Sequence, residues 1–552
     1  MTRLGLLVAG SLSEGLAARL DPTVPIEDVR LGKFVKIVGQ KYEYFCLVTD
    51  VQLDSANADV LRDPPGDPDA VDVFLRHVLS GTTTYAIIKL KPELMLANTT
   101  ADVEFDVHRQ AQDERDLVPR PARSIPPHFS NVSEATTADF ERIFGRDDGR
   151  NHFQIGQPID MDVPVCLDLR RFVERSNGVF GKSGTGKSFL TRLILCGVIK
   201  AQAAVNLIFD MHSEYGWSAK NEEGVEVKGL SQLFGGRVAV YTLDMESSRG
   251  RGIKPAGEIK IALRDLSVSD ITLLQDELKL HRTAVEAATL CEDKLGEDWA
   301  AQLLDMDGDG LAEFAVKNAG NINSLQALRS KLRLIDRLKF VERNLRHSTL
   351  DELVAQLERG HHVVVEFGRE RNLLAYILAA NLITRRLHEL WVKKTETYWA
   401  TKDEADRPRP LMITIEEAHK FLNADAARQT TFGTIARELR KFYVTLLVVD
   451  QRPSGIDAEV LSQIGTRITC QLNDERDIDA IFTGVSGGAH LRTVLATLDS
   501  REQALLLGHA VPMPMMIRTR KYDTAFYATV ATESAEIIAF HSRRYEEIFG
   551  NE

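Results

Sequence analysis

The sequence has few cysteines and no long apolar run, and these two absences exclude several classes of protein. Its 552 residues include five scattered cysteines and no C-x-x-C pair, so we expect reduced core residues rather than a zinc site. We find no run of eighteen apolar residues and no signal-peptide core followed by a cleavage site. The sequence therefore predicts a cytoplasmic globular protein of two or three domains, without a membrane partner.

An excess of positive charge is lacking as well. The formal net charge is −12, which argues against a protein that coats nucleic acid with its whole surface. A local basic lining remains compatible with this balance, because a few positioned Lys and Arg side chains supply the contacts to phosphates.

What the sequence does contain is a glycine-rich phosphate-binding loop. Residues 181–188, GKSGTGKS, match G-x-x-x-x-G-K-[ST], whose backbone N–H groups surround nucleotide phosphates. A short strand is predicted before the loop and a helix after it, with the helix N-terminus facing the phosphates. Lys187 can reach the β- and γ-phosphates, and the Ser188 hydroxyl can bind Mg²⁺. We therefore predict ATP or GTP binding with Mg²⁺, and the predicted cofactor-binding residues of the loop are Gly181, Ser183, Gly184, Thr185, Gly186, Lys187, Ser188 and Phe189.

Three predicted strands end in an acid and could supply the second half of this site; they end at Asp210, Glu416 and Asp450. In P-loop enzymes that use a catalytic glutamate, a further strand lies between the strand before the phosphate-binding (Walker A) loop and the strand that carries the Mg²⁺-binding acid (Walker B). The strand that ends at Asp210 directly follows the helix after the Walker A loop, so we do not expect Asp210 to be the Walker B acid. Residues 412–417, MITIEE, place two consecutive acids at the carboxyl edge of the sheet, where ligands bind.

We therefore predict that Glu416 holds Mg²⁺ through water and that Glu417 polarises the attacking water as general base. An exposed Glu-Glu pair at the start of a helix is the alternative.

Two acidic segments could be mistaken for further metal sites. Residues 210–215, DMHSEY, lack a second histidine and lie next to the predicted Mg²⁺ site, so we predict that this segment, Asp210 included, lines the ATP pocket rather than a separate metal site. Residues 305–310, DMDGDG, imitate the opening of a calcium-binding loop, but Val316 stands where the loop needs its twelfth-position glutamate. We predict a turn between helices there.

The remaining patterns divide the chain. Residues 1–110 are rich in β-type runs, and prolines make residues 111–150 typical of a linker or an extended wrapping segment. Leucines at helical spacing predict an α-helical insertion, whose interleaved basic residues are expected on a solvated helix face, with a nucleic-acid patch as the alternative. The remaining predicted boundaries are 151–262 for the first part of an α/β core, 263–358 for the insertion, 359–520 for the second part and 521–552 for a C-terminal extension.

The order of the motifs resembles a known family. The Walker A loop, DMHSEYG, LMITIEEAHKF, IARELRKFYV and DQRPSGID follow one another as in the HerA-type ATPases of the HerA/FtsK superfamily of hexameric DNA translocases. The likeness extends over about residues 165–520. It implies a RecA-like P-loop core of the additional-strand catalytic-glutamate class, an N-terminal β-barrel domain and a helical insertion.

The resemblance also implies roles for individual residues. Glu417 becomes the catalytic glutamate, Gln451 a polar sensor of the γ-phosphate, and Arg437 or Arg440 an arginine finger that enters a neighbouring subunit's site. The chain departs from the family pattern at Asp450, where a small residue is more usual, and at Leu439 within R-E-x-R-K. Because of these departures, the resemblance does not decide whether Arg437 or Arg440 enters the neighbouring subunit's site.

The implied function is an ATP-driven homohexameric motor on double-stranded DNA. Relatives work with a nuclease, or with a nuclease or sirtuin-like effector in antiphage defence, and this sequence shows no nuclease motif of its own. A secretion-type ATPase of the same superfamily is an alternative that the missing membrane anchor disfavours. A ring scaffold that activates an effector with little translocation is the other alternative.

Overall fold

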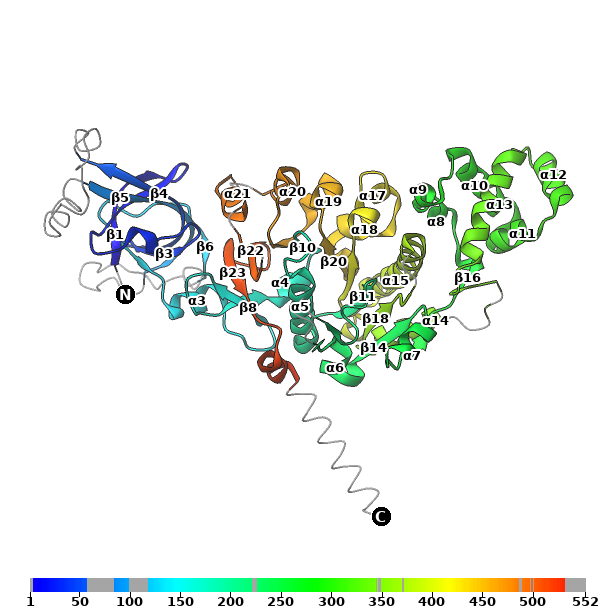
Figure 1. Ribbon diagram of the computed structural model, residues 1–552, viewed down its shortest axis with the longest axis horizontal. Helices are drawn as coiled ribbons and strands as arrows, with labels where there is room; N and C mark the ends of the chain where they lie inside the picture. Colours follow the sequence, from blue (N-terminus) through cyan, green and yellow to red (C-terminus); the bar gives the residue numbers. More distant parts are fainter. Residues whose placement is uncertain are drawn as a thin grey trace, which may run out of the picture. The chain divides into compact units, whose positions relative to one another are not determined.

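The computed structural model describes residues 3–56, 84–98, 118–220, 226–343, 345, 349–369, 372–485, 489–496, 498–499 and 501–531. The chain forms two compact units (Figure 1). The first contains Met1–Asp148, His152–Asp168 and Gly487–Arg520, and the second contains Gly149–Asn151, Leu169–Ser486 and Lys521–Glu552. Within the described ranges, no helix has the length and apolar character needed to cross a membrane.

The first unit contains the expected β-barrel. Its strands follow the order β2-β1-β7-β3-β4-β5-β6, and an additional pairing of β2 with β5 closes the barrel. Alternating apolar side chains such as Val35 and Ile37 fill its core. The bounds are β1 Arg3–Ser11, β2 Gly15–Leu20, β3 Phe34–Val38, β4 Tyr42–Ser55, β5 Thr84–Ala97, β6 Arg120–Pro121 and β7 Asn131–Glu134.

The predicted linker at residues 111–150 is structured in its described part. Strand β6 pairs with β5, and β7 pairs with both β1 and β3, so this segment completes the barrel. Helix α3 (Thr137–Phe144) follows, and a capping box between Thr136 and Asp139 begins it. The described part of this segment therefore lies along the barrel as an extended wrap, the second of the two alternatives, rather than as a free linker.

The first unit also takes in residues that the sequence places in the core. Four antiparallel strands lie in the order β22-β23-β8-β9. They are β8 (His152–Pro158), β9 (Val165–Asp168), β22 (Gln503–Gly508) and β23 (Met515–Thr519). Residues 487–520 thus group with the N-terminal barrel, whereas the sequence predicts that they end the ATPase core.

The second unit is built on parallel strands in the order β15-β14-β18-β11-β19-β20-β10-β21. Their nearly continuous burial is typical of a sheet covered on both faces. Strand β20 separates β10, which precedes the Walker A loop, from β19, which ends in Glu416; this is the strand order that the sequence argument for Glu416 requires. The bounds are β10 Asn177–Phe180, β11 Val205–Asp210, β14 Val238–Thr242, β15 Gly257–Glu258, β18 His362–Glu366, β19 Leu411–Glu416, β20 Val444–Asp450 and β21 Thr466–Thr469.

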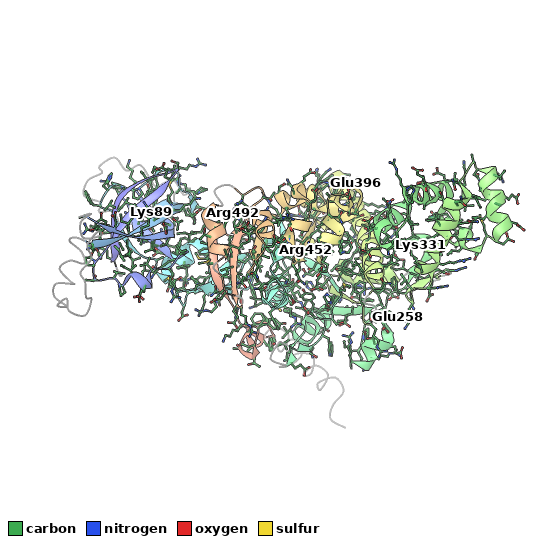
Figure 2. All side chains as sticks on the ribbon, turned by 45° about the horizontal axis from the view of Figure 1, so that its top comes forward. Lys89, Glu258, Lys331, Glu396, Arg452 and Arg492 are labelled. Carbon is green, nitrogen blue, oxygen red and sulfur yellow. The ribbon has the colours of Figure 1, made fainter. Side chains whose placement is uncertain are left out.

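The predicted helical insertion forms between two short strands, β16 (Ile261–Ala262) and β17 (Val341–Glu342), which pair with each other. Lys331 marks its last long helix in Figure 2. Helix α14 (Thr349–Glu358) packs against β18 and β11, so the insertion ends before residue 358. The insertion helices are α8 Val268–Leu273, α9 Gln275–Leu278, α10 Arg282–Leu295, α11 Trp299–Asp305, α12 Gly308–Lys317 and α13 Ile322–Asp336.

Within the insertion, the calcium-like segment begins a helix. The Asp307 side chain accepts the N–H of Gly310 as N-cap of α12. This contact is the structural role of the aspartate in that turn.

Candidate nucleotide-binding site

The glycine-rich loop joins β10 to helix α5 (Lys187–Ala201) with a backbone that needs its glycines. Gly181 has φ of +152°, and a Cβ there would lie 2.8 Å from the Cys470 Cβ. Gly186 is left-handed at the N-cap of α5. The Thr185 hydroxyl donates to the Lys182 carbonyl at 2.8 Å, which closes the loop on itself. The loop therefore presents the start of α5 and its N–H groups to one cavity.

Lys187 lies at the centre of this loop. Its Nζ donates to the Lys182 carbonyl oxygen at 2.8 Å. Burial lowers the pKa of Lys187, and the nearby acidic groups, Cys470 and Asp450 first, oppose that effect. The ammonium is thus held inside the site, within reach of an anion bound by the loop.

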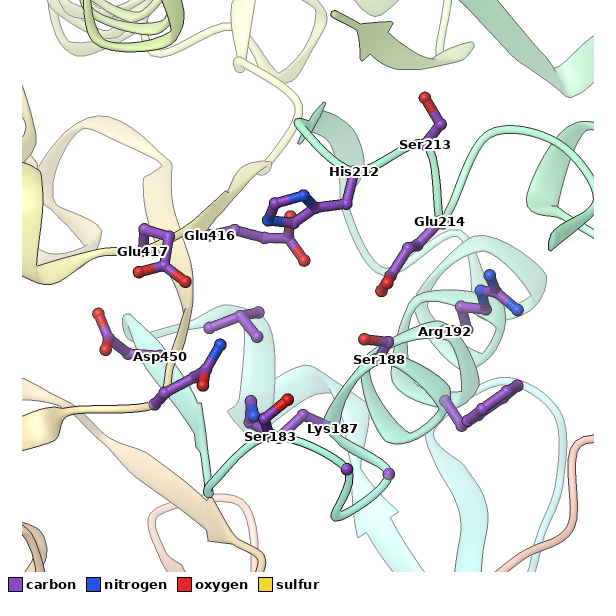
Figure 3. Close-up of a pocket in the computed structure, with 15 residues that line it drawn as sticks. Ser183, Lys187, Ser188, Arg192, His212, Ser213, Glu214, Glu416, Glu417 and Asp450 are labelled. Carbon is purple, nitrogen blue, oxygen red and sulfur yellow. The ribbon is translucent and has the colours of Figure 1, made fainter. Parts of the chain in front are cut away.

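A cavity of about 560 Å³ opens in front of the loop (Figure 3). The loop and α5 form one wall, and the carboxyl ends of β19 and β20 together with the segment after β11 form the other. The cavity is lined by Ser183, Gly184, Gly186, Lys187, Ser188, Phe189, Arg192, His212, Ser213, Glu214, Glu416, Glu417, Val449, Asp450 and Gln451. The structure thus brings most of the predicted site residues together from segments far apart in the sequence.

Glu416 ends β19 and is 7% exposed. Its Oε1 accepts the Tyr215 hydroxyl at 2.9 Å, whereas its Oε2 is buried and has no hydrogen-bond partner among the described residues. Burial, followed by the charges of Asp210 and Glu214, raises the pKa of Glu416 well above its usual range. A buried carboxylate oxygen without a donor fits a divalent cation or its bound water, and the Ser188 hydroxyl lies across the cavity.

Glu417 follows in a left-handed conformation, with φ of +51°. Such a backbone costs on the order of 1–3 kcal/mol for a residue with a side chain, and it commonly occurs at functional sites. The turn directs the two carboxylates to different places. Glu416 stays buried, whereas the Glu417 side chain is 30% exposed at the cavity. The alternative of an ordinary exposed Glu-Glu pair does not fit this arrangement.

A buried aspartate lies behind Glu417. Asp450, at the end of β20, accepts the backbone N–H of His419 at 2.7 Å and contacts its Nδ1 at 3.0 Å. The hydrogen bond to Asp450 raises the pKa of His419. The other ring nitrogen, Nε2, lies 3.8 Å from Glu417 Oε2. The residue at which this chain departs from the family pattern therefore contacts the histidine beside the predicted base.

Asp210 does not line the cavity, in contrast to the prediction. Its carboxylate is fully buried and accepts the backbone N–H groups of Glu214, Tyr215 and Gly216 at 2.7, 2.8 and 3.0 Å. Burial raises the pKa of Asp210, and the three N–H donors oppose this rise. Asp210 instead holds the turn that presents the lining residues His212, Ser213 and Glu214.

The DMHSEY pattern does not reveal which of its residues face the cavity. Sequence reasoning also missed Arg192, which lies on the same face of α5 as Ser188, four residues away. That spacing was a signal available in the sequence.

The remaining predicted residues have different positions. Gln451 lines the cavity next to Asp450. Arg437, at the end of helix α18 (Thr431–Glu438), does not line the cavity of its own chain. The Arg440 side chain lies outside the described residues, although its backbone belongs to the short helix η8 (Leu439–Phe442). Gly181 and Thr185 shape the loop from behind its lining surface.

A fourth acid ends the strand beyond β11. Glu366 of β18 pairs in register with Asp210, and its Oε2 accepts from Arg251 Nη2 at 2.7 Å. Burial raises the pKa of Glu366 to about 7, and the charge of Asp210 adds to the effect. The carboxyl edge of the sheet thus carries a row of acids, each with its own hydrogen-bonded partner.

Comparisons with known proteins show what this chain is similar to. Residues 153–387 match the family described as Helicase HerA, central domain. A probable DNA double-strand break repair helicase HerA of Methanocaldococcus jannaschii is 34% identical over 466 residues, which cover 78% of this chain and 88% of that protein. The DNA double-strand break repair helicase HerA of Saccharolobus solfataricus is 23% identical over 501 residues, which cover 90% of this chain and 88% of the relative.

Among solved structures, the plasmid coupling protein TrwB in complex with ADP and Mg²⁺ is similar to this chain with a TM-score of 0.43 and 11% identity. The match covers 70% of this chain and 92% of TrwB.

Proposed function

The chain belongs to the HerA helicase family, and from that premise we propose that it is an ATP-hydrolysing motor that moves double-stranded DNA through a homohexameric ring. As a member of this family the chain is an ATPase. The observation that carries the proposal is the pair Glu416 and Glu417, one buried with an oxygen that lacks a donor and the other turned toward the cavity opposite the Walker A loop. The names of the relatives, DNA double-strand break repair helicases, support DNA as the substrate.

The roles of the residues follow from their positions. Ser188 and Glu416 would hold Mg²⁺, which neutralises charge on the phosphates when it is bound. Lys187 would exchange the Lys182 carbonyl for phosphate oxygens, since its Nζ already lies at the loop. Glu417 would accept a hydrogen bond from the attacking water and orient it toward the γ-phosphorus.

Two further roles concern Gln451, at the end of a strand, and an arginine that reaches a neighbouring subunit. Gln451 follows β20 and lines the cavity, a position suited to sensing the γ-phosphate. Arg437 or Arg440 would reach the site of an adjacent subunit, where a guanidinium stabilises transition-state charge. This assignment supports a ring rather than an isolated chain, because Arg437 does not line its own cavity.

We further propose that the motor works with a partner effector, a nuclease or a sirtuin-like enzyme, in DNA end processing or antiphage defence. The absence of a nuclease motif from the sequence supports a partner that carries the cutting activity. The ring scaffold and the secretion-type ATPase predict a different response to DNA, so one experiment separates them from the motor.

That experiment compares the ATP hydrolysis rate with and without linear double-stranded DNA and measures the mass of the assembly. A motor should show DNA-stimulated hydrolysis in a hexamer, and Glu417→Gln, measured in parallel, should slow both basal and stimulated hydrolysis by about 10² to 10⁴. A hexamer whose hydrolysis ignores DNA would contradict the motor and favour the scaffold or the secretion-type ATPase.

A further inference from the structure

Two cavities open at the amino edge of the parallel sheet, opposite the nucleotide site. Strands β18, β11, β19 and β20 are neighbours and parallel, so their first residues lie together at this edge. A cavity of about 900 Å³ lies by the start of β20, and one of about 340 Å³ lies by the starts of β11 and β18. Gln202 and Pro410 line both cavities, so the two adjoin and form one groove, here called the amino-edge groove.

The amino-edge groove is strongly basic, although the whole chain has a net charge of −12. Its lining includes one carboxylate, Glu174, and eight Lys and Arg side chains. The eight are Arg150, Arg170, Lys200, Arg237, Arg359, Arg407, Arg409 and Lys441. A cluster of one sign in a protein of the opposite net charge points to an anionic ligand.

Several of these cations are not neutralised by the protein itself. Arg407 pairs with Glu404 at 3.2 Å, and Lys200 donates to the Thr529 carbonyl. Four others are exposed and have no carboxylate within ion-pair distance in the part of the chain that the structure describes. These four are Arg170, Arg359, Arg409 and Lys441. Such guanidinium and ammonium groups can bind phosphate with charge-assisted hydrogen bonds.

The groove also has an aromatic wall. Trp399 is 41% exposed, and Tyr443 has a left-handed backbone with φ of +59°. A bulky residue in that region is a strained outlier, of the kind that accumulates at binding sites. The Arg407 guanidinium stacks over the Tyr443 ring at 5.5 Å. The rings provide flat apolar surface beside the cations, which suits the sugars next to a phosphate chain.

We propose that the amino-edge groove binds the phosphate backbone of DNA. The inference rests on the proposed function in that it takes DNA as the substrate, and it adds a binding site at the edge of the sheet that ATP does not use. Four adjacent strands at about 4.8 Å spacing extend over roughly 14 Å, a length that matches about five phosphates of one DNA strand at about 3.4 Å of axis per step. Binding through phosphates is independent of base sequence, as a translocating motor requires.

The test uses the full chain with three cations neutralised, Arg170→Gln, Arg359→Gln and Arg409→Gln together. Binding of a fluorescent linear duplex is measured by anisotropy at several salt concentrations. We expect affinity to fall by about tenfold or more, and the slope of log K against log[salt] to flatten by about 0.9 for each phosphate that the variant no longer binds. Hydrolysis without DNA should be unchanged, because the nucleotide cavity lies at the other edge of the sheet.

Two control variants accompany this triple variant. Arg333→Gln, Arg337→Gln and Lys339→Gln remove three exposed cations from the insertion, and DNA affinity should stay near that of the wild type. Arg170→Lys, Arg359→Lys and Arg409→Lys keep the charge in the groove and should restore most of the affinity.

The outcomes separate this inference from the proposed function. If the wild type binds DNA and both Gln variants bind equally well, the groove assignment is wrong while the motor stands. If the wild type binds no DNA, the motor fails together with the groove. If the groove variant loses hexamer mass, the groove holds a neighbouring copy instead of DNA, and the proposal is overturned.

Discussion

The two edges of the parallel sheet in the second unit carry opposite charge. At the carboxyl edge, four neighbouring strands, β11, β18, β19 and β20, end in Asp210, Glu366, Glu416 and Asp450. At the amino edge, the same strands begin beside the Lys and Arg side chains of the groove. Parallel strands gather like ends, so residues far apart in sequence become one acidic row and one basic row.

The two rows differ in burial as well as in sign. Each acid is buried and has a defined partner: backbone N–H groups for Asp210, Arg251 for Glu366, Tyr215 for Glu416 and His419 for Asp450. Four cations of the groove are exposed and have no carboxylate partner among the described residues. Burial and hydrogen bonds shift the pKa of an acid and fix its position, whereas an exposed cation is available to bind a polyanion from solution.

The largest expected effect concerns contact between neighbouring subunits. Arg437 does not line the amino-edge groove, and a finger from the segment 437–442 that precedes β20 would reach the carboxyl edge of the next subunit. Arg437→Ala with Arg440→Ala should lower ATP hydrolysis by about 10³ to 10⁵ and leave ATP binding intact. Mixing this variant with Glu417→Gln, followed by subunit exchange, should restore phosphate release.

Recovery is expected because some mixed interfaces pair an intact Glu417 with an intact arginine. An arginine that acts within its own subunit would give no recovery at any ratio. A dilution of wild type into Glu417→Gln serves as the control, because a ring poisoned by its inactive sites would lose activity out of proportion.

The next effect separates the two adjacent glutamates. Glu417→Gln removes the proposed base at the cavity and should slow hydrolysis by about 10² to 10⁴ while ATP stays bound. Glu416→Gln removes the carboxylate that would hold Mg²⁺ and should shift the Mg²⁺ concentration needed for activity. Single-turnover hydrolysis and a Mg²⁺ titration measure the two. If Glu416→Gln trapped ATP while Glu417→Gln turned over normally, the roles would have to be exchanged.

A smaller effect tests the aspartate behind the base. Asp450→Asn should weaken the hold on His419 and reduce kcat by about tenfold, with little change in KM, because the nucleotide contacts remain. The hydrogen bond to Asp450 raises the pKa of His419, so the imidazolium beside Glu417 persists to higher pH in the wild type. The imidazolium lies 3.8 Å from Glu417 Oε2 and holds that carboxylate, so kcat should fall when His419 loses its proton, and in Asp450→Asn this fall should begin at lower pH.

Asp477→Asn is a matched control, since Asp477 accepts the Ser454 N–H away from the cavity. An unchanged pH profile in Asp450→Asn would assign Asp450 a purely structural role.

The sequence predicts the carboxyl edge far better than the amino edge. The Walker A loop is contiguous, and Glu416 with Glu417 follow an apolar run, so local spacing carries the information. The prediction for Asp210 is wrong because an acid at a strand end can either face a ligand or hold a turn, and only three-dimensional contacts distinguish these. The groove combines residues between positions 149 and 445 with no common spacing, so no motif indicates it.

The predicted domain limits differ from the compact units of the structure for a similar reason. Strand β7 completes the barrel from beyond the proline-rich segment, and its partners β1 and β3 lie about a hundred residues earlier. Pairing over such distances leaves little trace in a single sequence, whereas the burial pattern of β10 and β19 is visible locally.

The smallest effect concerns stability at the carboxyl edge. Burial raises the pKa of Glu366 to about 7 from 4.5, so between these values the folded chain binds a proton that the unfolded chain releases. The stability from protonated Glu366 is complete below pH 4.5 and is lost as pH rises through 7, by about 3 kcal/mol at most. Glu366→Gln should remove this dependence.

Chemical denaturation at pH 5 and pH 8 measures it. The free energy of unfolding of Glu366→Gln, relative to wild type, should be higher at pH 8 than at pH 5, because the amide stays neutral where the carboxylate ionises. The variant also loses the ion pair with Arg251, which is strongest at pH 8, where the wild-type carboxylate is charged. This loss lowers the stability of the variant at pH 8 and makes the difference between the two pH values smaller. Exposed Glu396→Gln is the control and should give the same difference at both pH values. An equally constant difference for Glu366→Gln would show that Glu366 is ionised throughout, its charge fully balanced by Arg251, and that the acidic row does not raise its pKa.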